Sequence, residues 1–163
     1  MANNTGWIAG RGQGLTFGGI SFTAGDLNSL ASGGGALGTT VVANGSTTLD
    51  QYADFSFVVT VGGTTVAGSY ITLFLLPLNQ DGTTYGDGYA SSSSTQAAAG
   101  YAIGSINVKV GVTTGNTVTG QINFVNLPPG SFKIAFGNNL QIALSSTAAM
   151  TLQYRTYNVS LNS

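Results

Sequence analysis

Alternating apolar and polar residues predict a series of β-strands in this 163-residue chain. The clearest alternation spans 54–61, where every second residue is apolar, as expected of a strand that buries one face. The same period of two recurs at 106–110, 132–136 and 150–157, and no stretch shows a convincing helical period. About seven or eight short strands separated by turns are typical of a β-sandwich. We therefore expect an all-β fold, a single jelly-roll-like or Greek-key sandwich, and the sequence leaves its strand order open.

The stretch 70–87, YITLFLLPLNQDGTTYGD, holds the longest apolar run. Its first seven residues are apolar on nearly both faces, which a strand tolerates only where both faces are covered or one of them meets a partner. This pattern predicts a central strand. Pro77 cannot donate a ladder hydrogen bond and should end the pairing, after which Asp81-Gly82 supplies a turn.

The second half of the chain adds three connections to this picture. The strands 106–110 and 122–124 flank a turn at 114–116 and are predicted to form a hairpin. Residues 127–130, Leu-Pro-Pro-Gly, predict a rigid corner, because two prolines fix φ while a glycine permits positive φ. The polar stretch 88–100 is interpreted as an exposed excursion.

Residues 1–38 differ from the rest because they hold 11 of the 25 glycines. Such a segment loses much backbone entropy on ordering and buries few large side chains. We assign 1–38 to an extended N-terminal arm and 39–163 to the sandwich domain. A flexible leader and ordinary strands of the domain are the alternatives. The arm is predicted to order on a partner through spaced apolar residues: Trp7, Ile8, Leu15, Phe17, Ile20 and Phe22.

Charged residues are scarce, with four basic and five acidic side chains and a net charge of −1. They make up 6% of the chain, against about 25% in ordinary domains. Either solubility rests on Ser, Thr, Asn and Gln, or much of the surface lies against partners, and we favour the second explanation. Four scattered cations cannot form the basic patch that DNA or RNA requires. No secretory signal and no apolar run of membrane-spanning length is present, so we expect a protein made in the cytoplasm and not integral to a membrane.

The residue types that carry most enzyme chemistry are missing, since the chain has no His, Cys or Glu. Asp81 and Asp87 are the only acids near one another, and each precedes a glycine, which favours turns. A calcium site there, or acid–base chemistry, is the less favoured alternative. We therefore expect no catalytic residues, no metal and no cofactor. Lys133 and Arg155 lie on the polar phase of their strands and are expected to pair with Asp54 or with a neighbouring subunit.

Three segments resemble a family of small virion proteins of tailed bacteriophages: YITLFLLPLNQDGTTYGDG at 70–88, NLPPGSFKIAFGNN at 126–139 and LQYRTYN at 152–158. The resemblance covers roughly residues 50–158, and the arm lies outside it. Members of that family look like capsid decoration or cement proteins, which sit over junctions between major capsid subunits.

The resemblance implies a non-enzymatic structural protein on the capsid surface of a virion. Its partners would be the major capsid protein and further copies of itself, as a dimer or trimer, with no nucleic acid, membrane or cofactor. A phage tail or fibre component that binds host-surface glycans through Tyr85, Tyr89 and Tyr101 is the alternative. A hydrolase is the least favoured class, because it needs a cluster of acids that this sequence does not display.

Overall fold

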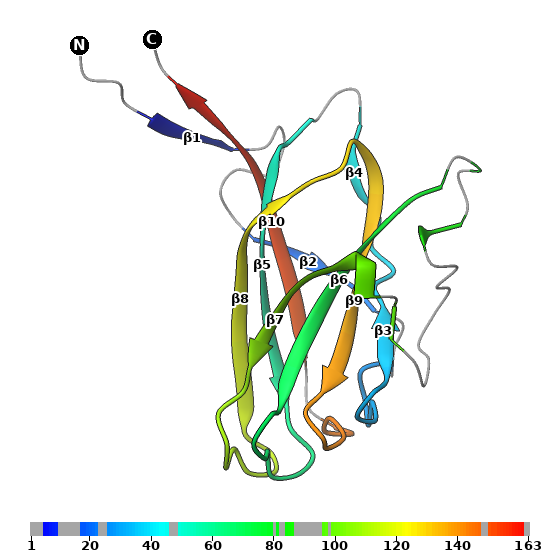
Figure 1. The fold of residues 1–163 in the computed structure, drawn as a ribbon, viewed down its shortest axis with the longest axis vertical. Coiled ribbons are helices and arrows are strands. Elements are labelled where there is room, and N and C mark those ends of the chain that lie inside the picture. The colour runs from blue at the N-terminus through cyan, green and yellow to red at the C-terminus, as the bar shows by residue number, and fades with distance from the viewer. Residues whose placement is uncertain are drawn as a thin grey trace.

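The structure is a computed structural model that describes residues 5–9, 17–22, 26–45, 49–79, 81, 84–86, 96–97, 99–147 and 150–161. Its strands form two antiparallel sheets that pack against each other, so the predicted all-β sandwich is confirmed (Figure 1). A short 3-10 turn, η2 (Ala99–Tyr101), precedes β7, and the part of the chain that is described contains no α-helix.

Each sheet has five strands. The first sheet has the order β1-β10-β5-β8, with β2 also paired to β10. Its strands are β1 (Thr5–Ala9), β2 (Gly18–Ile20), β5 (Tyr52–Thr60), β8 (Thr117–Asn126) and β10 (Thr151–Leu161). The second sheet has the order β3-β9-β6-β7, with β4 also paired to β9. Its strands are β3 (Gly35–Leu37), β4 (Val42–Asn44), β6 (Tyr70–Pro77), β7 (Ala102–Asn107) and β9 (Gly130–Asn139).

The chain passes back and forth between the two sheets. From β4 to β10, every connection crosses from one sheet to the other except the one between β6 and β7. The series β2-β10-β5-β8 thus faces the series β3-β9-β6-β7, with β4 beside β3 on β9. This is the strand order of a jelly roll, and it supplies the topology that the sequence left open.

The expected central strand is β6, which pairs with β9 on one side and β7 on the other. Both of its faces are covered, as the apolar run predicted. Ile71 and Leu73 face the main core between the sheets. Phe74 and Leu76 point the other way, into a second apolar cluster on the outer face of the second sheet. The strand ends at Pro77, as expected for a residue without a backbone donor.

The main core is built from inward-facing residues of both sheets, and its largest members are phenylalanines. Phe57 on β5 and Phe136 on β9 meet edge to face across the sandwich, with ring centroids 6.0 Å apart. Both are almost fully buried, as are Phe55 and Phe132. Burying each such side chain contributes about 1.5–3 kcal/mol, so the alternating residues of β5 and β9 supply much of the stability.

The predicted hairpin of 106–110 and 122–124 is wrong. β7 pairs with β6 and β8 pairs with β5, so these two consecutive strands lie in different sheets. Ile106 and Ile122 both pack against the main core from opposite sheets. Strands whose apolar faces meet across a core are stacked rather than hydrogen-bonded side by side, which the turn residues alone could not distinguish.

The excursion 88–100 is also not fully exposed. Ala97 is buried in the second apolar cluster, and the Gln96 side chain donates hydrogen bonds to Asn138 O (3.2 Å) and Asn139 Oδ1 (2.9 Å). These contacts cover the outer face of β6, which explains why that face can be apolar. The rest of the stretch up to Gly100 lies outside the described residues apart from Ala99 and Gly100 in η2.

The segment before residue 39 contributes strands to both sheets. β1 and β2 pair with β10, and β3 pairs with β9. Leu27 and Leu30 are buried in the main core. The alternative that part of this segment forms ordinary strands therefore describes residues 5–9, 18–20 and 35–37. An arm that orders on a partner, and its boundary at residue 38, stay predictions.

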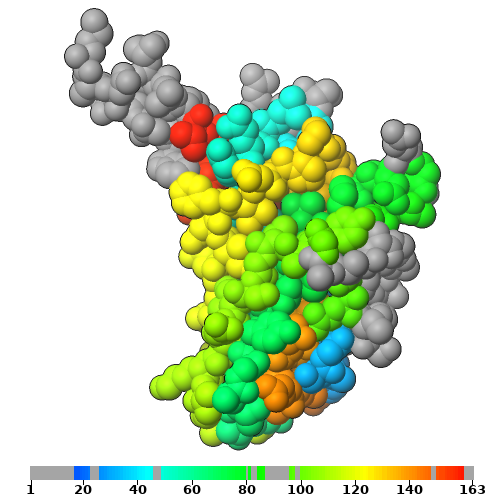
Figure 2. All heavy atoms as spheres, viewed as in Figure 1, coloured from blue at the N-terminus to red at the C-terminus, as the bar shows by residue number. Residues whose placement is uncertain are grey.

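One end of the sandwich gathers several chain segments. There β5 begins, β8 ends, and the last residues of β10 pair with β1 in a ribbon that stands out from the body (Figure 1). We call this the terminal end. In the space-filling view, the cyan atoms of the β4 region adjoin the yellow atoms of β8 and the red atoms of β10 at this end (Figure 2).

Candidate functional site

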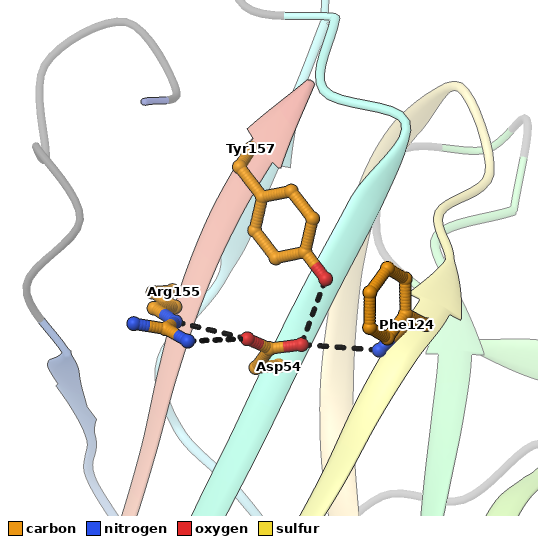
Figure 3. Close-up of polar contacts among 4 residues, drawn as sticks. All are labelled: Asp54, Phe124, Arg155 and Tyr157. Atoms are coloured by element: carbon orange, nitrogen blue, oxygen red, sulfur yellow. Dashed lines mark hydrogen bonds and ion pairs between the residues drawn. The ribbon is translucent and has the colours of Figure 1, made fainter. Parts of the chain in front are cut away.

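A buried carboxylate organises the terminal end. Asp54 lies on β5 between the inward-facing Ala53 and Phe55, so its side chain points to the outer face of the first sheet, yet only 4% of the residue is exposed. Arg155 on β10 is its direct cross-strand neighbour. The Arg155 guanidinium contacts Asp54 Oδ2 through Nε at 2.9 Å and through Nη2 at 2.8 Å (Figure 3). The predicted pairing of Arg155 with Asp54 is confirmed.

The other carboxylate oxygen joins two further strands. Tyr157 on β10 donates its hydroxyl to Asp54 Oδ1 at 2.8 Å, and the backbone N–H of Phe124 on β8 donates to the same oxygen at 3.0 Å (Figure 3). Burial, and then the hydrogen bond to Asp54, raise the pKa of Tyr157 to about 12. The phenol therefore stays protonated and acts as a donor at neutral pH. Asp54 thus ties β5, β8 and β10 together.

A β-bulge on β8 explains why a backbone N–H reaches Asp54. The register passes from Ala53 opposite Val125 to Phe55 opposite Ile122, so residues 123–124 of β8 face Asp54 alone. Phe124 takes the left-handed conformation, with φ of 59°. A residue with a side chain pays about 1–2 kcal/mol for this conformation, and the charge-assisted hydrogen bond to Asp54 offsets part of that cost.

The bulge also changes which way Phe124 points. Strict alternation along a regular strand would place Ile122 and Phe124 on one face, but Ile122 packs against the core whereas Phe124 is 58% exposed. The two residues differ because the extra residue of the bulge reverses the phase of the strand. The adjacent apolar pair Phe124-Val125 was the sequence signal for this reversal, since Val125 is the residue that turns back to the core.

Three rings surround the Asp54 contacts, and we call them the aromatic patch: Tyr52, Phe124 and Tyr157. Tyr52 stacks on Tyr157 with ring centroids 6.0 Å apart, and Phe124 meets both rings edge-on, at 6.4 Å from Tyr52 and 6.2 Å from Tyr157. Tyr157 is almost fully buried, so Phe124 is the member that presents most of its surface to the outside. Leu49, three residues before Tyr52, is 60% exposed.

A side-chain network fixes the segment that carries Leu49. Asn158 accepts a hydrogen bond from the backbone of Gln51 at 2.8 Å and donates to Asp50 Oδ1 at 3.0 Å and to the carbonyl of Leu49 at 3.2 Å. The Asn44 side chain holds the same segment through both the N–H and the carbonyl of Asp50. The backbone that carries the exposed apolar side chains of the terminal end is therefore fixed by hydrogen bonds, which lowers the entropic cost of binding a partner.

The six residues predicted to anchor the arm on a partner do not all lie at one place in the structure. Trp7 and Ile8 lie on β1 opposite Val159 and Asn158, and their side chains are outside the described part, as is all of Leu15. The Arg155 guanidinium lies over the ring of Phe17, 4.8 Å from its centroid.

The last two arm residues pack within the chain. Ile20 is buried in the main core, and Phe22 is half-buried against it with a bridge to Gly38. β1 and Phe17 thus lie along the same strand as Arg155 and Tyr157, whereas Ile20 is already covered by its own chain. A partner-contact role for these residues stays a prediction.

A second aromatic group lies on the outer face of the second sheet. Tyr85 and Tyr101 pack on the second apolar cluster, and Lys133 Nζ sits 4.7 Å from the Tyr85 ring centroid. A Cβ added to Gly86 would come within 2.7 Å of the Tyr101 ring, so the backbone at Gly86 rests on that ring. Of the three tyrosines predicted as a glycan platform, the structure thus places two on one cluster, and Tyr89 lies outside the described residues.

The predicted turn at Asp81 is confirmed. Asp81 accepts hydrogen bonds from the backbone N–H of Thr84 at 2.9 Å and from the Thr84 hydroxyl, as turn aspartates do. Asp87 lies outside the described residues. Where the structure describes the chain, no three acidic, His or Cys side chains gather as a metal site would require, and no helix is long and apolar enough to span a membrane.

The chain was compared with models of protein families, with curated proteins and with solved structures, and none of them matches it.

Proposed function

We propose that this chain is a non-enzymatic structural virion protein, a capsid cement or decoration protein that binds over junctions of major capsid subunits and stabilises the head. The observation that carries the proposal is the exposed ring of Phe124, held in a strained bulge by a buried carboxylate, with the exposed Leu49 just before β5 at the same end of the sandwich. Strained backbone is retained where surrounding structure enforces it, and it concentrates at functional sites. A rigid exposed aromatic side chain is the usual centre of a protein interface.

The distribution of charged side chains supports the proposal that much of the surface is covered by partner proteins. Asp54 and Arg155 neutralise each other, and Asp50 is buried and hydrogen-bonded. Lys133 lies over the Tyr85 ring. Four of the nine charged side chains are thus engaged within the chain, and the net charge of −1 gives copies little mutual repulsion in solution. A surface of this kind favours association with a neutral protein surface, and it does not supply the cluster of basic side chains that binds nucleic acid.

A cement protein needs no chemistry of its own. It stabilises a shell because it binds the assembled lattice better than the loose subunits, and the difference in binding free energy is added to the stability of the lattice. The symmetry of a shell repeats each small contact many times. Two exposed apolar side chains, Phe124 and Leu49, are a sufficient contact in such a shell, even where a single contact is weak.

The fold agrees with the proposal without deciding it. Jelly rolls occur in viral capsid proteins and also in lectins, and a fold alone does not determine function. The assignment rests on the patch at the terminal end and on the resemblance of residues 70–88, 126–139 and 152–158 to small phage virion proteins.

The proposal is tested by sedimenting the purified protein with phage heads that lack it and, separately, with unassembled major capsid subunits. We expect the protein to sediment with heads, to saturate at a fixed ratio to the major capsid protein, and to bind loose subunits at least tenfold more weakly. Equal binding to heads and loose subunits would remove the cement mechanism, because no stability would then be transferred to the lattice.

The second candidate is a tail or fibre component that binds host-surface glycans, favoured by the placement of Tyr85 and Tyr101 on one apolar cluster, with Lys133 over the Tyr85 ring. Sugars stack on aromatic rings and hydrogen-bond to neighbouring polar groups. Under this alternative the protein would bind a glycan array, and the Tyr85→Ala variant would lose that binding while Phe124→Ala would keep it. The cement function predicts the opposite dependence in head binding.

A further inference from the structure

The two sides of the sandwich are closed in different ways. On the side of β2 and β3, backbone groups join the two sheets: the Thr39 N–H donates to the Ser21 carbonyl at 2.6 Å, and Phe22 forms a bridge with Gly38. The Ser21 N–H also donates to the Thr40 hydroxyl at 2.8 Å. This side is sealed by hydrogen bonds that run from one sheet to the other.

The side formed by β7 and β8 is closed only by side chains. A Cβ on Gly104 would meet Ile122 at 3.0 Å, and a Cβ on Gly120 would meet Ile106 at 2.6 Å, so each isoleucine fills the space above a glycine of the opposite sheet. Within the described residues no backbone hydrogen bond joins β7 to β8. Among the described strands, none pairs with the outer backbone edge of β7 or of β8.

β8 is the longer of these two edges. It runs for ten residues, TVTGQINFVN, and pairs only with β5 in the described part of the chain; Figure 1 shows it on the flank of the molecule. Natural edge strands are protected by charged side chains, prolines, bulges or a covering segment. β8 contains no charged residue and no proline. Its bulge at 123–124 disturbs only the terminal end, which leaves 117–122 as a regular, unprotected edge.

We propose that this edge pairs with β8 of a second copy, antiparallel and across a twofold axis, so that the first sheets of two copies become one continuous sheet. In such a pairing each strand meets its own sequence, and a charged residue close to the twofold axis would stand near the same charge of the partner. β8 avoids this repulsion in every register. Its exposed Thr119 and Gln121 instead bring uncharged hydrogen-bonding side chains to the pair.

This inference goes beyond the proposed function, because it names the contact through which two copies of the chain would associate. The occupant is a second copy and not a strand of a capsid subunit, because the absence of charge matters most where a strand faces itself. The two occupants give different results in the experiment below.

The test introduces charge at the edge. The double variant Thr119→Lys/Gln121→Lys places lysines at two exposed positions of 117–122. The matched control Gln153→Lys adds a lysine at an exposed position of β10, an interior strand flanked by β5 and β2. Size-exclusion chromatography with light scattering measures the mass from about 1 to 100 μM. We expect a dimer for the wild type and for Gln153→Lys, and at least a tenfold larger dimer dissociation constant for the double variant.

A charge-complementary pair keeps the test specific. The variant Thr119→Glu/Gln121→Glu should be monomeric alone, because its edges repel, and should form a mixed dimer with the lysine variant. Circular dichroism checks that each variant is folded. A wild type that stays monomeric at about 100 μM, a concentration at which even a weak dimer would form, would overturn the proposal. A lysine variant that dimerises like the wild type would overturn it too.

Head binding is measured in parallel so that the two proposals are judged separately. A monomeric wild type whose head binding is lost in the lysine variant would assign the edge to a capsid strand and overturn self-pairing. A wild-type dimer that fails to bind heads would contradict the cement function and leave the β8 pairing supported.

Discussion

The backbone N–H of Phe124 donates to Asp54 Oδ1 at 3.0 Å from a residue whose φ is 59°. An exposed aromatic ring and a buried carboxylate on neighbouring strands are thereby coupled. The carboxylate holds the bulge, and the bulge turns the ring outward. The polar contacts of the terminal end and its apolar surface are parts of one arrangement, so changes to either should affect the other.

Removing the carboxylate should destabilise the fold. Asp54→Ala leaves the Tyr157 hydroxyl, the Phe124 N–H and part of the Arg155 guanidinium without their acceptor. Since Arg155 remains partly exposed to water, we expect a loss of about 2–4 kcal/mol in the free energy of unfolding. Urea denaturation measures it. Ser56→Ala, on the same face of β5, should cost less than about 1 kcal/mol, and an equal loss in both variants would contradict a specific role for Asp54.

Replacing Phe124 should separate binding from stability. Phe124→Gly removes two ring contacts but also relieves the left-handed strain, so the free energy of unfolding should change by less than about 1 kcal/mol. Head binding should weaken about thirtyfold or more, as for the loss of a central interface residue. The control is Val110→Ala, equally exposed but located after β7, which should bind heads like the wild type. Unchanged binding by Phe124→Gly would exclude the aromatic patch as the contact.

Stability should fall at high pH because of Tyr157. Its pKa is raised from 10.0 to about 12 in the folded chain, so the folded state favours the protonated phenol. The resulting stabilisation is complete below pH 10 and is lost as the pH rises from 10 towards 12. The loss is at most about 2–3 kcal/mol.

The measurement for this prediction is the urea midpoint at several pH values from 8 to about 12. Tyr157→Phe, which keeps the ring and loses the hydroxyl, should be less stable than the wild type at pH 8. The difference between the two proteins should shrink above pH 10. A constant difference across this range would show that Tyr157 does not titrate as the buried hydrogen bond to Asp54 requires.

Two strand glycines should respond differently to the same substitution. In Gly120→Ala the new methyl group would lie 2.5 Å from the Phe57 ring and 2.6 Å from Ile106, which forces core side chains to move. We expect a loss of about 1–3 kcal/mol. Gly19→Ala, on β2 with no atom within 4 Å of the new Cβ, should be neutral or stabilising by up to about 1 kcal/mol. Thermal unfolding of both variants gives the comparison.

The sequence predicted the elements better than their partners. The apolar run 70–76 identified a central strand because its outward residues Phe74 and Leu76 also needed cover. The Pro128–Gly130 corner was also recognisable, and Gly130 adopts a φ of 98° between β8 and β9. Both features are local, so the chemistry of a few residues determines them.

Strand pairing depends on contacts between distant parts of the chain, which local patterns do not encode. β7 and β8 follow one another and are both amphipathic, yet they lie in opposite sheets because Ile106 and Ile122 fill the same core. The site was only partly predictable for the same reason. The Asp54–Arg155 pair followed from two lone charges on polar phases, whereas the bulge at Phe124 required knowing that β8 lies beside β5.

The cement function is tested most directly by the rupture temperature of heads that lack the protein, measured with and without a saturating amount of it. The account predicts regular density over subunit junctions in images of the treated heads and a higher rupture temperature. The increase should be absent with Phe124→Gly and retained with Val110→Ala. Heads that carry no such density, or that carry it and rupture at the same temperature as bare heads, would contradict the central claim.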